Sequence, residues 1–311
     1  MKAAQISQYG SAEVINVVEI NKPQLAEGQV LVEVHAASIN PFDTIVREGY
    51  VRNMIKSLPI TLGGDVAGVV SEVGEGVADF AVGDKVYGQA NVVAGNSGAF
   101  AEFAATKAGQ LGKMPANLNF VEAGAIPLTG ESALQVITEH MQLAPGQKIL
   151  IHGGAGGIGT VAIQIAKHLG AYVATTATDD GIQYVKDLGA DEVIDYKTQR
   201  FEDVVHDYDA VFDTVGGETY TRSFAVLKKG GMIVSMVEQE NIELASKHEV
   251  KVVHQFTKVS TDSLNELSKL IEDGVITVHV DKTYSLDQIS QAFTDRESGT
   301  VRGKIAIEIK S

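Results

Sequence analysis

A glycine-rich segment lies between an apolar run and a helical pattern near the middle of the chain. The apolar run 148–152 leads into a G-x-G-x-x-G arrangement, and apolar residues recur at helical spacing over 158–169. In such a loop one glycine permits a tight turn, another lets the backbone approach a pyrophosphate, and the third lets the helix pack on the strand. The first N–H groups of the helix then point at the phosphates. We therefore predict a dinucleotide site formed by Gly154, Ala155, Gly156, Gly157, Ile158 and Gly159.

The end of the next expected strand, 172–177, bears on which dinucleotide fits. A site for NAD usually has an acidic residue there, which holds the ribose hydroxyls. This strand tip instead has the small hydroxyl residues Thr176 and Thr178, which leave room for a 2′-phosphate. Asp179 and Asp180 follow at once, and no lysine or arginine does. We expect NADP(H) as the cofactor, with NAD(H) as the alternative; a plain helix cap is the interpretation of these aspartates that involves no ligand.

Residues that would support other chemistries are missing from the sequence. The chain has no cysteine, which excludes disulfides, thiol catalysis and cysteine-built zinc sites. None of the nine tyrosines begins the Tyr-x-x-x-Lys pair of short-chain dehydrogenases, and neither G-x-S-x-G nor H-E-x-x-H occurs. We interpret His152, which precedes the glycine loop, as a hydrogen-bonded residue at a strand end rather than as a catalytic base.

The charge of the chain is strongly acidic. Its 25 Lys and Arg residues stand against 40 Asp and Glu residues, for a net charge of −15. Such a surface repels phosphate backbones and anionic lipid headgroups, so neither nucleic acid nor a membrane is an expected partner. No stretch approaches 18 uncharged apolar residues, and the first residues lack the apolar core of a signal peptide. We expect a cytoplasmic protein.

The elements that must position these residues fall into two groups. Over residues 1–120, short apolar runs such as 30–34 and 65–73 are separated by glycine-rich turns, which indicates a barrel-like β unit. From Pro145 onward strands alternate with helical stretches, which predicts a doubly wound parallel sheet. Its six strands are expected at 148–152, 172–177, 192–196, 209–215, 232–237 and 250–256.

The C-terminal stretch has a different pattern. It offers a strand at 275–280, a short helix near 286–294 and a closing strand at 304–309. A chain of 311 residues holds one large domain or two ordinary ones. We expect these last strands to return to the first, β-rich unit.

Seven further segments match one family, in order, along the whole chain. They are A-S-I-N-P-F-D-T at 37–44, G-G-D-V-A-G-V-V at 63–70, V-G-D-K-V-Y-G at 82–88, A-I-P-L-T-G at 125–130, L-G-A-D at 188–191, F-D-T-V-G-G at 212–217 and R-G-K at 302–304. With the glycine loop, they resemble the zinc-free, quinone-oxidoreductase-like branch of the medium-chain dehydrogenase/reductase superfamily. The resemblance implies an α/β fold in two domains with the active site in the cleft between them. These are a GroES-like β-barrel domain at 1–122, completed by 275–311, and a Rossmann domain with a doubly wound parallel six-stranded sheet at 123–274.

The resemblance also implies that no zinc ion takes part. Zinc-containing relatives have cysteine at the position of Asn40 and a His-Glu pair where Gly64 and Asp65 stand here. Without zinc, an alcohol or ketone loses its Lewis acid. A quinone or enone can still accept a hydride from the nicotinamide, because the negative charge spreads onto a carbonyl oxygen. We therefore expect an NADPH-dependent quinone or enone oxidoreductase acting on a small hydrophobic electrophile.

Three residues are candidates for the chemistry. Asn40 is expected to orient the substrate or nicotinamide, although it could be only a turn residue before proline. Asp43 resembles a position that supports the site, with a turn or cap role as the alternative. Tyr50 could donate a proton or form a stacking wall, but a surface aromatic is the favoured interpretation. Close relatives often carry tyrosine at the Ile45 position, which this chain lacks.

The remaining cofactor contacts follow from the resemblance alone. Relatives place a basic residue near Gly181 to bind the 2′-phosphate, and glycine departs from that pattern. Tyr196 is expected beside the adenosine phosphate or else as a strand-end aromatic, and Arg302 as a cofactor contact or else in a solvated salt bridge. The residues expected around the nicotinamide and its ribose are Thr129, Ser132, Gly216, Val237 and Phe256.

Two other functions stay open. The first is an enoyl-thioester reductase, which would need a basic rim for a bulky acyl carrier and so fits the acidic charge poorly. The second is a non-catalytic NADPH-binding redox sensor. The resemblance also implies a homodimer that pairs through the edge of the Rossmann sheet.

Overall fold

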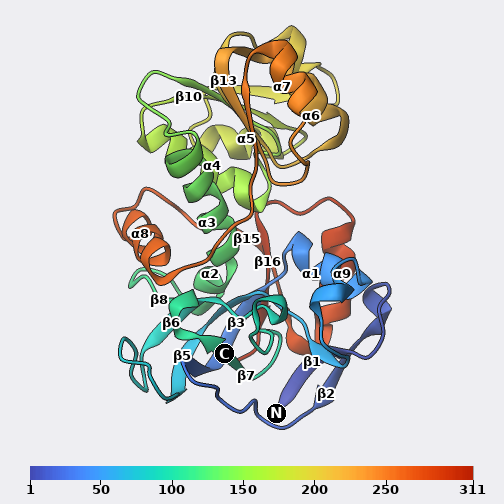
Figure 1. Cartoon of the computed structure of the whole chain (residues 1–311), viewed down its shortest axis with the longest axis vertical. Helices are drawn as coiled ribbons and strands as arrows, with labels where there is room; N and C mark the ends of the chain where they lie inside the picture. Colours follow the sequence, from blue (N-terminus) through green and yellow to red (C-terminus); the bar gives the residue numbers. More distant parts are fainter. Residues whose placement is uncertain (311) are drawn as a thin grey trace. The chain divides into compact units, whose positions relative to one another are not determined.

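The computed structural model describes residues 1–310, and their contacts divide the chain into two compact units (Figure 1). The first unit comprises Met1–Leu128, Val259–Gly274 and the chain from Val278 onward. The second comprises Thr129–Lys258 and Val275–Thr277. The first unit is therefore assembled from three separate stretches of the sequence.

A seven-stranded sheet is the frame of the first unit. Its strands, in spatial order, are β15 (Val280–Ser285), β16 (Lys304–Glu308), β3 (Gln29–Ser38), β5 (Asp65–Val73), β6 (Lys85–Gln89) and β8 (Leu111–Lys113), with β7 (Phe103–Lys107) beside β3. Val30, Val32 and Val34 alternate along β3 and are buried in one core with Phe100 and Phe293. The closing strand is confirmed, because β16 pairs antiparallel with β3.

A smaller sheet and four α-helices complete the first unit. The sheet has the order β2 (Ile15–Glu19), β1 (Lys2–Ile6) and β4 (Ile60–Thr61). The helices are α1 (Pro41–Glu48), α2 (Phe120–Ala125), α8 (Thr261–Glu272) and α9 (Ile289–Glu297). The helix α9 connects β15 to β16, which makes that strand pair parallel.

The strand expected at 275–280 is wrong in position. Residues 275–279 are not in a strand, and β15 begins only at Val280. The amide of Gln164 takes the bonds that a neighbouring strand would make: its Oε1 accepts from the N–H of Thr277 at 2.8 Å, and its Nε2 donates to the Thr277 carbonyl at 3.1 Å. A side chain of the second unit therefore holds this segment.

Helix α8 lies with the first unit, whereas the domain boundaries expected from the sequence put it in the Rossmann domain. The Tyr87 hydroxyl on β6 donates to the carbonyl of Leu264 at 2.6 Å, and Thr261 donates to the Leu111 carbonyl at 2.8 Å. These contacts attach the helix to β6 and to the beginning of β8. Helical periodicity could not show which sheet α8 packs against.

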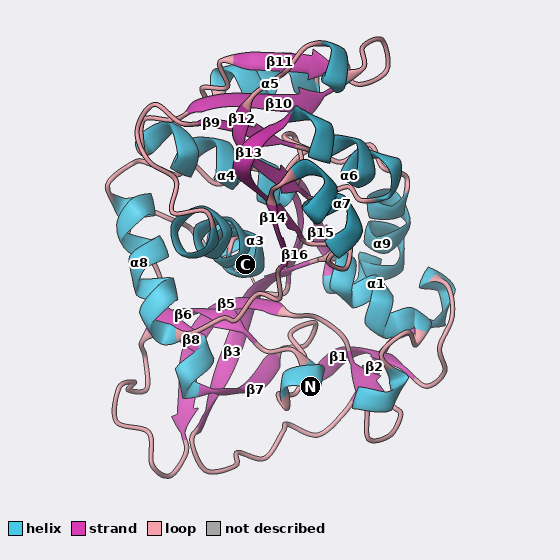
Figure 2. Ribbon diagram, turned by 45° about the horizontal axis from the view of Figure 1, so that its top comes forward, coloured by secondary structure: helices cyan, strands magenta, loops and turns pink. Residues whose placement is uncertain are grey.

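The second unit is built on a parallel sheet of six strands, as predicted. Its strand order is β11 (Glu192–Asp195), β10 (Tyr172–Ala177), β9 (Lys148–Ile151), β12 (Tyr208–Asp213), β13 (Leu227–Ser235) and β14 (Lys251–His254). Its helices are α3 (Pro127–Leu134), which starts at the unit boundary, α4 (Gly157–His168), α5 (Gly181–Asp187), α6 (Gly217–Ser223) and α7 (Ile242–His248). In chain order the strands stand 3-2-1-4-5-6, which is the doubly wound Rossmann arrangement (Figure 2).

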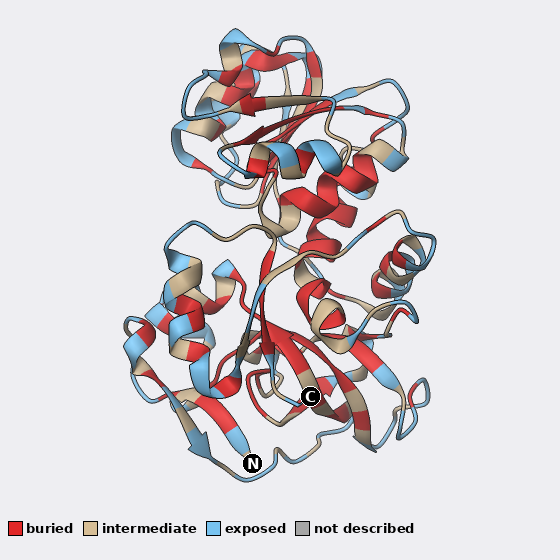
Figure 3. Ribbon diagram, turned by 180° about the vertical axis from the view of Figure 1, so that it is seen from behind, coloured by how far each residue is buried: buried red, intermediate tan, exposed pale blue. Residues whose placement is uncertain are grey.

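The strands of the second unit are apolar on both faces because helices cover the sheet. Ile149, Leu150 and Ile151 are all fully buried on the central strand β9. Figure 3 shows buried residues along the strands of this sheet. The helix α4 buries a continuous run from Gly159 to Ala166. Within residues 1–310 no helix is long and apolar enough to cross a membrane.

Candidate active site

The glycine loop joins β9 to α4 and packs closely against β10. A Cβ atom at Gly154 would lie 2.0 Å from Oγ1 of Thr175, and one at Gly159 would lie 2.3 Å from the carbonyl oxygen of Gly153. Packing therefore requires glycine at both positions. Gly156 is less constrained, because its φ of −82° suits any residue and a Cβ atom would lie 3.3 Å from the Gly153 carbonyl oxygen, a tight contact that a small shift could relieve. Close approach of a ligand's phosphates is a further physical reason for glycine there.

Thr176 holds this loop from the neighbouring strand. Its hydroxyl accepts the N–H of Gly153 at 3.1 Å, and its carbonyl accepts the N–H of Gly154 at 3.1 Å. The two ring nitrogens of His152 lie 3.3 Å from the Thr176 hydroxyl and 2.9 Å from that of Ser223. Burial lowers the pKa of His152 to about 3, so its ring is neutral. His152 is a hydrogen-bonded core residue, in agreement with its interpretation from the sequence.

Two opposite charges meet beyond the tip of β10. Asp179 adopts a left-handed conformation at φ 51°, and its Oδ2 lies 2.6 Å from Nζ of Lys197. Thr178 donates to Oδ1 of Asp195, the last residue of β11, at 3.1 Å. Sequence reasoning found no basic residue directly beside Asp179 and Asp180 and missed Lys197, which comes 18 positions after Asp179. Lys197 could have been found by assuming that the successive strands β10 and β11 pair in parallel, because the residues that follow them then lie side by side.

The cofactor residues expected around the ribose and nicotinamide lie beyond the carboxyl ends of strands in the second unit or on α3. Gly216 follows β12 at φ 79° and donates its N–H to Oδ1 of Asp213 at 2.9 Å. Val237 follows β13 and Phe256 follows β14, with side chains 52% and 74% exposed. Doubly wound proteins bind their ligands at this carboxyl edge, where exposed apolar side chains are otherwise costly.

The other expected contacts have more varied surroundings. Thr129 and Ser132 are buried on α3, and the Ser132 hydroxyl lies 2.7 Å from that of Thr257. Tyr196 is exposed in the turn that also carries Lys197. Arg302 belongs to the first unit, in the turn before β16. The structure thus gathers the loop, Thr176, Thr178, Tyr196, Gly216, Val237 and Phe256 at or beyond one edge of the sheet.

A buried polar cluster in the first unit contains Asn40. Its Nδ2 donates to Oδ2 of Asp65 at 2.7 Å, and its Oδ1 accepts from Nζ of Lys304. The Lys304 ammonium also lies 3.4 Å from the same Asp65 oxygen. The Ser38 hydroxyl and the N–H of Leu128 donate to Asp65 at 2.8 Å and 3.0 Å. An ammonium and a carboxylate are therefore in contact here, and the Asn40 carboxamide bonds to both.

Strand register brings this cluster together. Ser38, at the end of β3, stands opposite Asp65 on β5 and opposite Ala306 on β16. Asn40 comes two residues after Ser38, and Lys304 is the first residue of β16. Sequence reasoning named Asn40 but gave Asp65 and Lys304 no role, although both stand in segments that carried the family resemblance. Knowing that the C-terminal strand pairs with β3 would have found Lys304.

Asp43 lies in the first turn of α1 and accepts the N–H of Asn40 at 2.7 Å, so it also serves as a helix cap. Burial raises the pKa of Asp43 to about 7, and the negative charge of Asp65 adds to the rise. Tyr50 follows the same helix, but its side chain is 78% exposed. The structure joins Asp43 to the Asn40 cluster and leaves Tyr50 on the surface.

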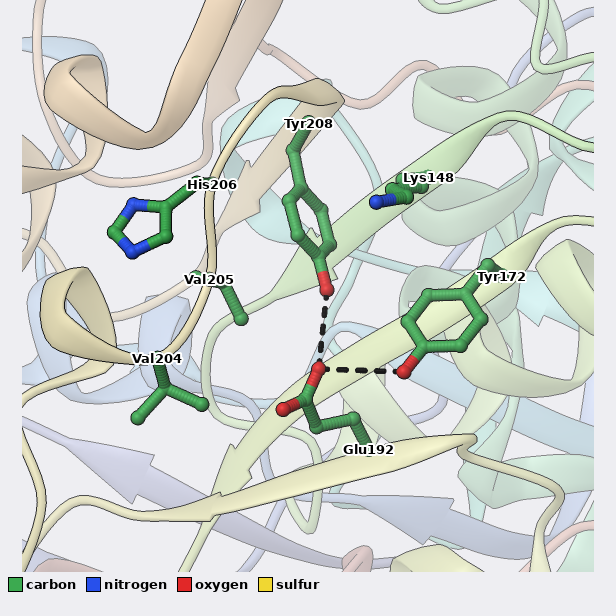
Figure 4. Close-up of a pocket in the computed structure, with 7 residues that line it drawn as sticks. All are labelled: Lys148, Tyr172, Glu192, Val204, Val205, His206 and Tyr208. Atoms are coloured by element: carbon green, nitrogen blue, oxygen red, sulfur yellow. Dashed lines mark hydrogen bonds between the residues drawn. The ribbon is translucent and has the colours of Figure 1, made fainter.

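A cavity of about 430 Å³ lies elsewhere in the second unit (Figure 4). Four of its residues begin the strands β9, β10, β11 and β12, so it opens at the amino ends of the sheet, opposite the glycine loop. Oε2 of Glu192 accepts from the hydroxyls of Tyr172 and Tyr208, each at 3.3 Å. This cavity is therefore not the dinucleotide site. Within residues 1–310 no three His, Cys, Asp or Glu side chains are grouped to hold a metal ion.

A glycine loop on the first turn of a doubly wound sheet, with a separate β-rich unit, defines a two-domain Rossmann dinucleotide-binding protein. Two family models match the chain: "Alcohol dehydrogenase GroES-like domain" at residues 26–116 and "Zinc-binding dehydrogenase" at residues 188–307. The chain belongs to the medium-chain dehydrogenase/reductase superfamily, in the branch of quinone oxidoreductases and alkenal/one reductases.

Three similar proteins show this membership. The 2-methylene-furan-3-one reductase of Solanum lycopersicum is 34% identical, over 99% of this chain and 79% of its own length. The chloroplastic NADPH-dependent alkenal/one oxidoreductase of Arabidopsis thaliana is 33% identical over the same shares. The structure of the quinone oxidoreductase from Coxiella burnetii is 33% identical, with a TM-score of 0.93 over 100% of this chain and 99% of that one.

Proposed function

We propose that this protein is an oxidoreductase that uses NADPH to reduce a quinone or an α,β-unsaturated carbonyl compound. The observation that carries the proposal is the glycine loop, which is intact on the first turn of the Rossmann sheet and has no side chain at Gly154, Gly156 and Gly159. Relatives named for NADPH, enone and quinone chemistry support it. When bound, NADPH supplies the hydride.

We propose further that the reaction does not use zinc. The Asn40 cluster has the acidic side chains of Asp65 and Asp43 and one carboxamide, and Asp43 is engaged as the cap of α1. It has no thiol and no imidazole, the groups from which catalytic zinc sites draw most of their three protein ligands. The Lys304 ammonium already contacts both Asp65 and Asn40, and a second cation there would be repelled. These donors do not fit a zinc ion, although the matching family is described as zinc-binding dehydrogenases. The Lys304 ammonium, paired with Asp65, takes the place of a metal cation in this cluster.

The residues of the chain then have distinct tasks. The N–H groups of the glycine loop and the first turn of α4 bind the pyrophosphate, and Thr176 fixes that loop. Asp65 and Lys304 hold both ends of the Asn40 carboxamide, which leaves its second N–H to orient a carbonyl oxygen of the substrate. Hydrogen bonding of that kind stabilises the enolate charge as it develops.

A Gly156→Ala variant tests the cofactor site with little risk to the fold. The added methyl would lie 3.3 Å from the backbone oxygen of Gly153, which must shift by a few tenths of an ångström, and it fills the approach of a pyrophosphate. We expect NADPH binding to weaken by about tenfold or more. Gly109→Ala is the matched control, since a Cβ atom there meets nothing within 4 Å.

The activity itself is tested by NADPH oxidation with a panel of quinones, enones and alkenals. Turnover of at least one class by the wild type, lost in Gly156→Ala and kept in Gly109→Ala, is the expected result. If NADPH binds tightly and no member of the panel is reduced, the proposal of catalysis fails and a redox sensor explains the binding.

We also propose a homodimer paired through the outer edge of the Rossmann sheet, working in the cytoplasm. The strand β14 ends the six-stranded order and pairs only with β13 among the described strands, so its other edge can accept a second copy. A measured particle mass equal to that of one chain would reject the dimer.

A further inference from the structure

A turn that follows β11 supplies a positive charge at the tip of β10. The register of the two parallel strands sets Asp195 opposite Ala177. Two residues later, Lys197 reaches past the strand end, and its Nζ lies 2.6 Å from Oδ2 of Asp179. The side chains of Lys197 and Asp179 are 56% and 68% exposed, so both can reach a ligand in solvent.

The turn that carries Lys197 is held firmly. Oδ1 of Asp195 accepts the N–H of Lys197 at 3.0 Å and the hydroxyl of Thr178 at 3.1 Å, while Oδ2 accepts the hydroxyl of Thr198 at 3.0 Å. One carboxylate thus ties the turn to the end of β10. The backbone of Lys197 has a fixed place, and only its long side chain needs to move.

We infer that Lys197 binds the 2′-phosphate of NADPH and that Asp179 is its counter-ion in the free protein. This inference rests on the proposed function and names the residue that selects the dinucleotide. The tip of the second strand of a Rossmann sheet is where the adenosine ribose lies. A phosphate with a charge near −2 attracts the ammonium more strongly than one carboxylate does.

Packing explains why the cation comes from this turn and not from the start of α5. Gly181, the first residue of α5, is buried, and a Cβ atom there would lie 3.2 Å from the Cβ of Ala155 in the glycine loop. A long basic side chain at 181 would therefore press on the loop that binds the pyrophosphate. Lys197 brings the same charge to the strand tip without occupying that space.

The rival assignment makes Asp179 a ligand of the ribose hydroxyls in NADH. The two assignments predict opposite effects on dinucleotide binding when Asp179 is replaced. If Lys197 binds the phosphate, Lys197→Ala weakens NADPH binding by about tenfold or more and leaves NADH binding unchanged. Asp179→Asn then tightens NADPH binding, because it removes a competing and repelling carboxylate. If Asp179 binds the ribose, Asp179→Asn weakens NADH binding instead.

The test is calorimetric titration of NADPH and NADH into the intact wild type and four variants. Lys197→Arg should restore the preference for NADPH that Lys197→Ala loses. Lys229→Ala is the matched control, since Lys229 forms a similarly exposed pair with Glu249 at 2.9 Å near the start of β13. The NADPH affinity of the wild type should also fall with salt more steeply than that of Lys197→Ala.

The outcomes separate the inference from the function on which it rests. A wild type that prefers NADPH, with that preference unchanged in Lys197→Ala, overturns the role of Lys197 alone. Preference for NADH, or binding of neither dinucleotide, overturns both the inference and the NADPH-dependent function. Loss of the preference in Lys197→Ala together with the Arg rescue supports both.

Discussion

Replacing Lys304 by methionine probes the buried charge pair of the first unit. The side chains of Lys304 and Asp65 are 7% and 1% exposed, so the change leaves a carboxylate without its cation in a dry environment. Breaking such a pair costs about 3–5 kcal/mol of the free energy of unfolding. Three hydrogen-bond donors remain on Asp65, from Ser38, Asn40 and the Leu128 N–H, which places the expected loss near the lower end, about 3 kcal/mol.

A double-mutant cycle isolates this interaction. Lys304→Met, Asp65→Asn and the double variant are unfolded with urea, and the shift of each midpoint is read at constant slope. Because Asp65→Asn removes the charge that the lysine compensates, the double variant should lose less than the two single variants together, with a coupling of about 1–3 kcal/mol. The activity of Lys304→Met should fall too, since Asn40 loses the donor to its Oδ1.

The result that refutes this reasoning is specific. If Lys304→Met lowers the free energy of unfolding by less than about 1 kcal/mol and its effect adds to that of Asp65→Asn, the ammonium is solvated and contributes like a surface lysine. The account of Asn40 as a carboxamide held between two charges would then be wrong. Lys310→Met serves as a control, because its bond to Glu33 at 2.7 Å is at the surface.

Further predictions concern the other candidates. Asp43 binds a proton in the folded state between its ordinary pKa of 3.8 and about 7, so stability falls as the pH rises through that window. Asp43→Asn should flatten this slope of the unfolding free energy, by up to about 4 kcal/mol in total, and remove any step near pH 7 from the rate profile. Tyr50→Phe should change stability by less than about 0.5 kcal/mol, and a large loss of kcat would show that its hydroxyl is a proton donor. Phe256→Ala should raise the KM for NADPH and leave the free energy of unfolding nearly unchanged, because the side chain is 74% exposed.

The sequence sufficed for features that are encoded locally. The glycine loop, the six strands of the second sheet and the hydrogen-bonded state of His152 at a strand end follow from residue types within a few positions of one another. Packing and the local pattern both require glycine in this loop, because Gly154 and Gly159 have no room for a Cβ atom. The end of β10 is a local feature as well, and the strand ends at Ala177 as expected.

The charges that complete these sites depend instead on which strands pair. Lys304 is more than two hundred positions from Asn40 and meets it because β16 closes the sheet beside β3. Lys197 meets Asp179 only because β11 runs parallel to β10 in one register. A shift of one residue in either register would turn these side chains to the opposite face. The spacing of glycines describes the backbone within one loop, whereas the register between strands decides which side chains a cation meets. Lys197, which we propose selects the dinucleotide, therefore cannot be found from the sequence of β10 and the residues that directly follow it.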